Sequence, residues 1–265
     1  MNKRGILVVS FGTTYSDTRE KTIEAIEREL KEQFSDRTFY RAFTSEIVRS
    51  VIWEKEGIQI PNVAIALEQM HRDGIQDILV QPTHVIAGME YDKMITQIQE
   101  KREWFETIRI GKPLLNETRD YEVAAKAILE ETNRNVNWTK HMAVVYMGHG
   151  SEHEANQCYP ILQKTFRKMG SENIYVSTVE GSPILDETIC EIRKNEYHTI
   201  VLQPFMIVSG DHARNDMASR QTNSWKSRLE EMGYQTICLL KGLGELEEIR
   251  HLFSLHAEEA VGLNE

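Results

Sequence analysis

The chain has 265 residues, of which 40% are apolar, so it is long enough to form one large domain or two smaller ones with a buried core. Its formal charge of −10 at pH 7 repels the phosphates of nucleic acids, and no stripe of lysine and arginine offsets that charge. The three cysteines form no CxxC pair, which argues against a disulfide framework and against a cysteine zinc site.

The first apolar run, residues 6–11, is too short for the core of a signal peptide. No later run approaches the roughly 20 apolar residues that a membrane helix requires. We therefore expect a cytoplasmic protein that binds neither a membrane nor a nucleic acid. The sequence leaves a homo-oligomer open.

Apolar runs typical of strands alternate with amphipathic stretches typical of helices along the whole chain. The predicted strands, in chain order, are residues 6–11, 38–43, 77–81, 107–110, 142–147, 174–179, 199–204 and 236–240. Predicted helices include residues 17–34, with Ile23, Ile26 and Leu30 on one stripe, and residues 62–72. This alternation predicts an α/β protein with parallel sheets and helices on both faces.

The second half of the sequence repeats the first. Residues 8–13 match residues 144–149, and the segment that ends in Gln81-Pro82 matches the one that ends in Gln203-Pro204. Each half closes with a strand, a turn and an acidic helix. We therefore predict two βα domains, residues 1–135 and residues 136–265, which meet at the polar stretch 133–140.

The candidate site follows from where the strands end. Ligands of open parallel sheets bind beyond the carboxyl ends of the strands, and in the second half those positions hold His149, Glu180 and His212. Two imidazoles and a carboxylate can hold a borderline ion such as Co²⁺ or Zn²⁺ and leave positions open for a substrate. Glycines beside each candidate allow sharp turns. The sequence therefore predicts a metal site in the second domain.

The first half lacks a matching set of ligands. Thr13 stands where the second half has its first histidine, and Thr44 or Ser45 stands near the equivalent of the glutamate. Glu90 occupies the position of the second histidine and is the one matching ionisable group. We expect the first domain to contribute the facing wall of a cleft.

Each candidate also has a structural interpretation, and for His149 it is a surface-loop histidine whose ring is satisfied by the backbone. Glu90 and Glu180 lie where helices are expected to begin, and an interaction with the helix dipole would explain both acids. His212 would belong to a helix start that Asp211 caps.

Three further residues are interpreted as structural. His84 aligns with a methionine of the second half and is predicted to be a packing residue, and His256 is predicted to lie on a helix surface. Cys190 is predicted to be a buried small hydrophobe.

Six segments resemble the anaerobic sirohydrochlorin cobaltochelatases, class II chelatases related to ferrochelatases. They are residues 6–14 (ILVVSFGTT), 81–85 (QPTHV), 145–151 (VYMGHGS), 179–183 (VEGSP), 202–205 (LQPF) and 209–217 (SGDHARNDM). The resemblance covers nearly the whole chain, with the segments in order.

The resemblance implies two Rossmann-like domains that face each other across a cleft, and it implies Co²⁺ ligation by His149, Glu180 and His212. His149 would accept pyrrole protons, with His212 and Glu90 as further catalytic candidates. The implied reaction is a lyase-class insertion of Co²⁺ into sirohydrochlorin, with release of two protons, in anaerobic cobalamin biosynthesis. No organic cofactor or nucleotide is expected, since the chain has no GxxxxGK[ST] loop.

Sirohydrochlorin carries many carboxylates, which helix N-termini, loop N–H groups and hydroxyls would receive. The expected substrate-binding residues are Ser10, Thr13, Ser209, Gly210 and Asp211. Two rival functions remain open. One is insertion of Fe²⁺ or Ni²⁺, because ligand type does not separate these ions. The other is a non-catalytic two-lobed protein that carries a metal or a tetrapyrrole.

Overall fold

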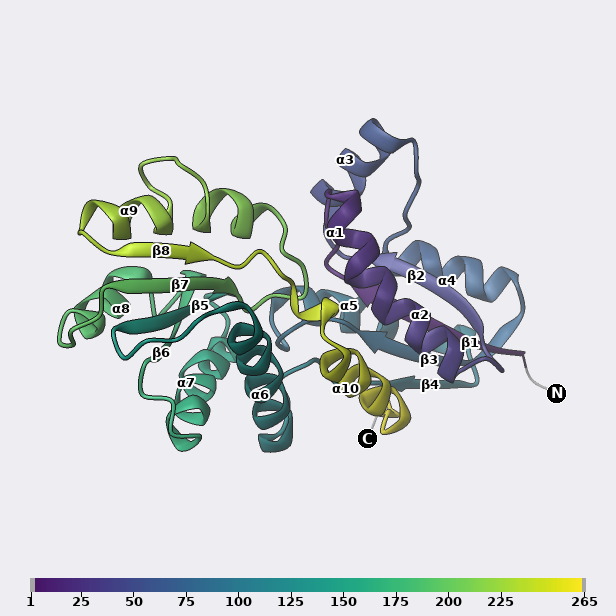
Figure 1. The fold of residues 1–265 in the computed structure, drawn as a ribbon. Coiled ribbons are helices and arrows are strands. Elements are labelled where there is room, and N and C mark those ends of the chain that lie inside the picture. Colours follow the sequence, from purple (N-terminus) through teal and green to yellow (C-terminus); the bar gives the residue numbers. More distant parts are fainter. Residues whose placement is uncertain (1–2, 264–265) are drawn as a thin grey trace. The chain divides into compact units, whose positions relative to one another are not determined.

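The computed structural model describes residues 3–263. The chain forms two compact units, one of Met1–Asn116 with Glu247–Glu265 and one of Glu117–Leu246 (Figure 1). Within the described residues, no helix is both long enough and apolar enough to cross a membrane.

The first unit is built on a sheet of order β2-β1-β3-β4-β9. Its strands are β1 (Lys3–Ser10), β2 (Thr38–Phe43), β3 (Ile75–Pro82), β4 (Thr107–Ile110) and β9 (Val261–Gly262). Strands β1 to β4 are parallel, and β9 runs antiparallel to β4. The helical elements are α1 (Ser16–Lys21), α2 (Ile23–Gln33), α3 (Glu46–Glu56), α4 (Val63–Arg72), α5 (Met89–Glu100), the 3₁₀ turn η1 (Arg102–Trp104) and α10 (Glu247–Glu258).

The second unit is built on a parallel sheet of order β6-β5-β7-β8. Its strands are β5 (Met142–Gly150), β6 (Ile174–Glu180), β7 (Thr199–Pro204) and β8 (Gln235–Cys238). The helical elements are α6 (Thr118–Asn135), the 3₁₀ turn η2 (Glu154–Gln157), α7 (Cys158–Lys168), α8 (Leu185–Ile192), the π-helix η3 (His212–Met217), α9 (Trp225–Glu231) and the 3₁₀ turn η4 (Leu243–Glu245).

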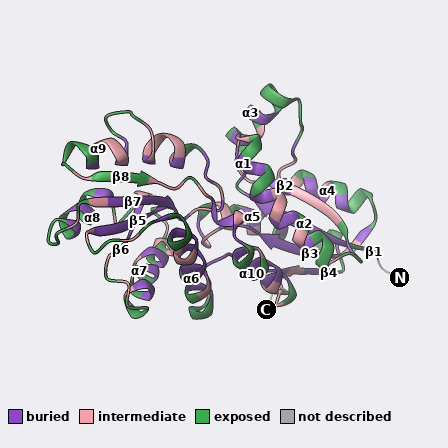
Figure 2. Ribbon diagram, in the orientation of Figure 1, coloured by how far each residue is buried: buried purple, intermediate pink, exposed green. Residues whose placement is uncertain are grey.

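Burial of the strands explains why they can be recognised in the sequence as continuous apolar runs. The inner strands β1, β5 and β7 are buried along most of their length, as parallel strands covered on both faces must be (Figure 2). All eight predicted strands are present, and the α/β class is confirmed. The predicted helix 17–34 is interrupted at Thr22, where α1 ends and α2 begins.

The two units divide the chain differently from the predicted boundary at residue 135. Helix α6 groups with the second unit, and α10 with β9 groups with the first. Side chains on α10 explain its place: Arg250 and Ser254 contact Glu29 of α2, both at 3.3 Å. Each unit therefore includes the closing helix of the other half of the sequence repeat.

Two predictions of burial are wrong, and the helix faces explain both. His256 is 0% exposed, because α10 packs into the first unit. Cys190 is exposed, because α8 buries the face formed by Leu185, Thr188 and Ile189, and residue 190 lies one step away from it.

A buried chain of hydrogen bonds ties α6 to the second sheet. The Thr132 hydroxyl lies 2.8 Å from the Tyr146 hydroxyl on β5 and 2.7 Å from Gln203 Oε1 on β7. The Thr132 hydroxyl also lies 2.8 Å from the Ile128 carbonyl oxygen of its own helix. This oxygen and the Gln203 amide oxygen can only accept, so Thr132 donates its one proton to them and Tyr146 donates to Thr132. All three side chains are at most 1% exposed, so no water replaces a lost partner.

We predict that Thr132→Val lowers the free energy of unfolding of the second unit by about 2–4 kcal/mol, because two buried polar groups lose a partner. Urea denaturation measures this change. Thr165→Val is the matched control, since among residues 3–263 the Thr165 hydroxyl bonds only the Ile161 carbonyl of its own helix. Equal losses in both variants would show that the hydrogen-bond chain contributes nothing specific.

Candidate metal centre

The second sheet has a topological switch point between β5 and β7. The chain leaves β5 for β6 on one side and then crosses to β7 on the other, so the strand order reverses at this point. Ligands of open α/β sheets bind at such a switch point, beyond the carboxyl ends of the strands. His149 lies at the carboxyl end of β5, and His212 follows the loop after β7.

The structure brings these two imidazoles together. Their ring centroids are 4.8 Å apart, and the ring planes meet at 85°. His149 Nδ1 lies 2.9 Å from the Gly150 carbonyl oxygen, and His212 Nδ1 lies 2.6 Å from Asp216 Oδ2. Both oxygens accept, so Nδ1 is the donor in each ring and Nε2 carries the lone pair of the neutral imidazole. Both histidines are therefore in the tautomer that binds a metal through Nε2.

The segment that carries His212 has unusual backbone geometry. Residues His212–Met217 form a π-helix, a rare element that is frequent at functional sites. Asp216 lies four residues after His212 and orients its ring, the role that a carboxylate often has behind a histidine ligand. The alternative interpretation, a cap by Asp211, does not hold, since the Asp211 side chain makes no capping hydrogen bond and accepts from Asn215 at 2.8 Å.

Glu180 ends β6, where its backbone pairs with Gly150 of β5. Its side chain is exposed, and among residues 3–263 no group of three His, Cys, Asp or Glu side chains is placed to hold a metal ion. The structure thus brings together two of the three predicted ligands, and the carboxylate lies at the end of the adjacent strand.

Two residues of the second unit that the sequence analysis did not select hold these loops. Asn156 accepts from the Ser151 N–H at 3.0 Å and donates to the Ser182 carbonyl at 2.5 Å, which joins the loops after β5 and β6. The Tyr159 hydroxyl accepts from the Gly150 N–H at 3.2 Å. Burial raises the pKa of Tyr159, so this hydroxyl stays protonated. No ligand motif contains these two residues, so the sequence offered no signal for them.

The glycines around His149 are required by close contacts. A Cβ on Gly148 would lie 2.2 Å from the ring of Tyr159. Gly150 has φ +82°, and a Cβ there would lie 1.4 Å from the Glu180 carbonyl oxygen. The strand end that carries His149 can therefore approach α7 and β6 only with glycine at positions 148 and 150.

The first unit holds Glu90 in the first turn of α5, where Oε1 lies 2.5 Å from Lys93 Nζ. This position in the first turn agrees with the helix-dipole interpretation. It also places the carboxylate close to the loop that follows β3, where a catalytic residue is expected. The hydroxyls of the two predicted substrate ligands are engaged internally. Ser10 accepts from Thr83 at 2.7 Å, and Thr13 accepts from the Tyr15 N–H at 3.3 Å.

The remaining candidates surround the π-helix. Ser209 is 3% exposed, and Gly210 is buried with its carbonyl accepting from the Arg214 N–H at 3.0 Å. Asp211 is exposed. The structure thus places all three before His212, although only Asp211 presents its side chain to solvent.

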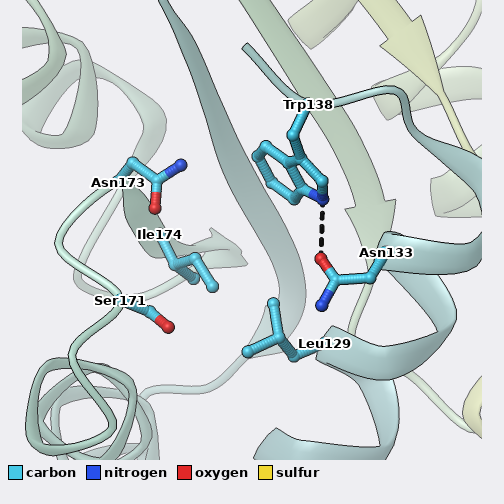
Figure 3. A pocket seen from close by; sticks show the side chains of 6 residues that line it. All are labelled: Leu129, Asn133, Trp138, Ser171, Asn173 and Ile174. Carbon is cyan, nitrogen blue, oxygen red and sulfur yellow. Dashed lines mark hydrogen bonds between the residues drawn. The ribbon is translucent and has the colours of Figure 1, made fainter. Parts of the chain in front are cut away.

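A pocket of the second unit lies elsewhere. Trp138 and Asn133 line it, with a hydrogen bond of 2.6 Å between them, together with residues next to the start of β6 (Figure 3). These residues adjoin the amino ends of β5 and β6, whereas His149 and Glu180 adjoin the carboxyl ends. The pocket is not the candidate metal centre.

The fold and the ring pair define an α/β protein of two units, with two adjacent histidine rings at the switch point of the second sheet. The chain matches the family described as "Cobalt chelatase (CbiK)" over residues 4–262. It belongs to this cobalt chelatase family.

Similar proteins cover the whole chain. It is 37% identical to the sirohydrochlorin cobaltochelatase of Salmonella typhimurium over 98% of this chain and 97% of that one. It is 31% identical to the sirohydrochlorin cobaltochelatase CbiKC of Nitratidesulfovibrio vulgaris, over 98% and 92%. Among solved structures, SirB from Bacillus subtilis with Fe³⁺ has a TM-score of 0.68 at 16% identity, over 97% and 95%, which supports the fold.

We predict that Gly150→Ala disrupts the end of β5, because its Cβ would overlap the Glu180 carbonyl in addition to the left-handed backbone penalty of about 1 kcal/mol. The expected loss exceeds about 4 kcal/mol in the free energy of unfolding. Gly170→Ala is the matched control, since Gly170 has φ +80° and nothing within 4 Å of a built Cβ. Thermal denaturation compares them, and similar melting temperatures would contradict the steric argument.

Proposed function

We propose that this protein is a lyase-class sirohydrochlorin cobaltochelatase, which inserts Co²⁺ into sirohydrochlorin and releases two protons. The observation that carries the proposal is the pair of imidazoles at the carboxyl edge of the second sheet, 4.8 Å apart and each with Nδ1 within hydrogen-bond distance of an oxygen. Membership of the cobalt chelatase family and the named activity of both curated relatives support it.

Metal insertion exchanges two pyrrole protons for one cation, so the site needs metal ligands and proton acceptors. An imidazole serves both purposes, since its ordinary pKa of about 6.5 allows it to act as a neutral ligand or as a base. In the proposed assignment, His149 and His212 offer Nε2 to the Co²⁺ substrate, and His149 then accepts a pyrrole proton. Glu90 is the proposed acceptor in the first unit.

Glu180 is the proposed third ligand. Among the described residues no hydrogen bond or ion pair holds its carboxylate, so a change of rotamer costs no such interaction. Two nitrogens and one oxygen bind a borderline ion less firmly than a thiolate cage does, and the macrocycle can then take the metal. A cleft between the two units, and substrate contacts by Ser10, Thr13, Ser209, Gly210 and Asp211, stay predictions.

The experiment that tests the function is an absorbance assay of purified protein with sirohydrochlorin and Co²⁺, Fe²⁺ or Ni²⁺ in turn. We expect Co²⁺ to give the fastest insertion above the uncatalysed rate. Faster insertion of Fe²⁺ or Ni²⁺ would replace the metal in the proposal. Binding of the tetrapyrrole without insertion of any metal would favour a carrier protein instead.

We predict that His149→Ala lowers turnover about 10²- to 10³-fold, because it removes a ligand and a proton acceptor together. Glu180→Ala should lose less and recover at high Co²⁺ concentration, since mass action offsets weaker metal capture. Turnover measured as a function of Co²⁺ concentration separates the two variants, and fluorescence titration checks that both still bind sirohydrochlorin. Recovery of His149→Ala at saturating Co²⁺ would show that His149 is only a ligand.

We also predict that Asp216→Asn weakens Co²⁺ binding about 10- to 100-fold, because the His212 ring loses the carboxylate that orients it. Isothermal titration with Co²⁺ measures the change. Asp186→Asn is the control, since this exposed acid of the same unit pairs with Arg228 and not with a histidine. Unchanged affinity in Asp216→Asn would exclude an orienting role.

A further inference from the structure

The first unit has a switch point of its own, between β1 and β3. Its strand order β2-β1-β3-β4 reverses there in the same way as in the second sheet. The Ser10 and Thr83 hydroxyls, 2.7 Å apart, join the carboxyl ends of these two strands. His84 follows directly, and Glu90 lies six residues further on, at the start of α5.

His84 is an unusual residue for this place. It is 9% exposed, and among the described residues neither of its ring nitrogens has a hydrogen-bond partner. A buried polar group without a partner costs about 1–3 kcal/mol. The predicted packing role accounts for the burial and for the edge-on contact with the Tyr91 ring at 6.4 Å, but an apolar residue would pack there without that cost.

One carboxylate oxygen of Glu90 also lacks a hydrogen-bond partner among the described residues. Its Oε1 atom is paired with Lys93, whereas Oε2 is buried and has no hydrogen-bond partner among the described residues. The carboxylate acts electrostatically on the His84 ring. Two unpartnered groups that can form a hydrogen bond with each other therefore lie at one switch point.

Burial holds His84 neutral. It lowers the pKa of this histidine to about 4, and the charge of Glu90 opposes the shift only in part. Tyr91 is the other titratable group whose ring contacts His84, and burial raises its pKa, so it also stays neutral. A neutral imidazole keeps one nitrogen lone pair, which can accept a hydrogen bond.

We propose that His84 is a positioning residue for Glu90, whose ring accepts a hydrogen bond from the Glu90 carboxyl group once that group has taken a pyrrole proton. The inference rests on the proposed function. A pyrrole N–H bond breaks, a carboxyl O–H bond forms on Glu90, and the electron pair stays on the pyrrole nitrogen for the incoming Co²⁺. The O–H group then donates to His84, which stabilises the protonated carboxyl and makes Glu90 a stronger base.

The test compares two substitutions of His84 in the cobalt-insertion assay. His84→Phe fills a similar volume without an acceptor, whereas His84→Gln supplies an amide oxygen that accepts the same hydrogen bond. We expect His84→Phe to lower kcat about tenfold with KM for Co²⁺ and sirohydrochlorin unchanged, and its melting temperature to equal or exceed that of the wild type. The acid limb of its pH profile should move to lower pH, because Glu90 becomes a weaker base. His84→Gln should stay within about threefold of the wild type.

The Glu90→Gln background provides the second readout. If the two residues act as a unit, His84→Phe causes no further loss there. Wild-type turnover in His84→Phe, an equally slow His84→Gln, or the full tenfold loss in the Glu90→Gln background would each overturn the inference.

If His84→Phe does not fold, His84→Leu takes its place. A wild-type protein that inserts no Co²⁺ would overturn the proposed function itself, a result distinct from an active enzyme that is indifferent to His84.

Discussion

Parallel pairing around a central strand is the constraint on which this protein depends. In each unit one strand, β1 or β5, has its successors on both sides, and the parallel ladders bring the carboxyl ends of the parallel strands to one edge. Residues separated by some 60 positions in the chain, such as His149 and His212, meet there with their rings 4.8 Å apart. The strand order brings the two histidines to the same edge, and individual contacts then set the orientation of their rings.

The edge holds its histidines through contacts that lie behind them. Asp216 and the Gly150 carbonyl fix the tautomers, and Asn156 joins the loops after β5 and β6. A metal ligand must be oriented and yet release its ion to the substrate. The hydrogen bond at Nδ1 of each ring, at the ends of buried strands, meets the first requirement.

The two halves of the repeat share one topology but carry different side chains after their switch points. Both have a switch point lined by small hydroxyl-bearing or glycine residues, and both continue into a loop and a helical segment. In the second half that loop leads to His212, and in the first it leads to His84 and Glu90. The exchange of α6 and α10 between the halves adds a topological link, because each unit depends on a helix from the other repeat to cover its sheet.

The sequence by itself determined the α/β class, the eight parallel strands and the strand-end positions of the candidate ligands, because buried parallel strands are continuous apolar runs and their ends are marked by glycine. Motif resemblance added the chemistry. Tertiary structure alone decided which unit α6 and α10 join, that His256 is buried and Cys190 exposed, and that two of the three predicted ligands lie together. Each of these depends on contacts between segments far apart in the chain, such as Glu29 with Arg250, and local periodicity contains no information about the partner of a helix face.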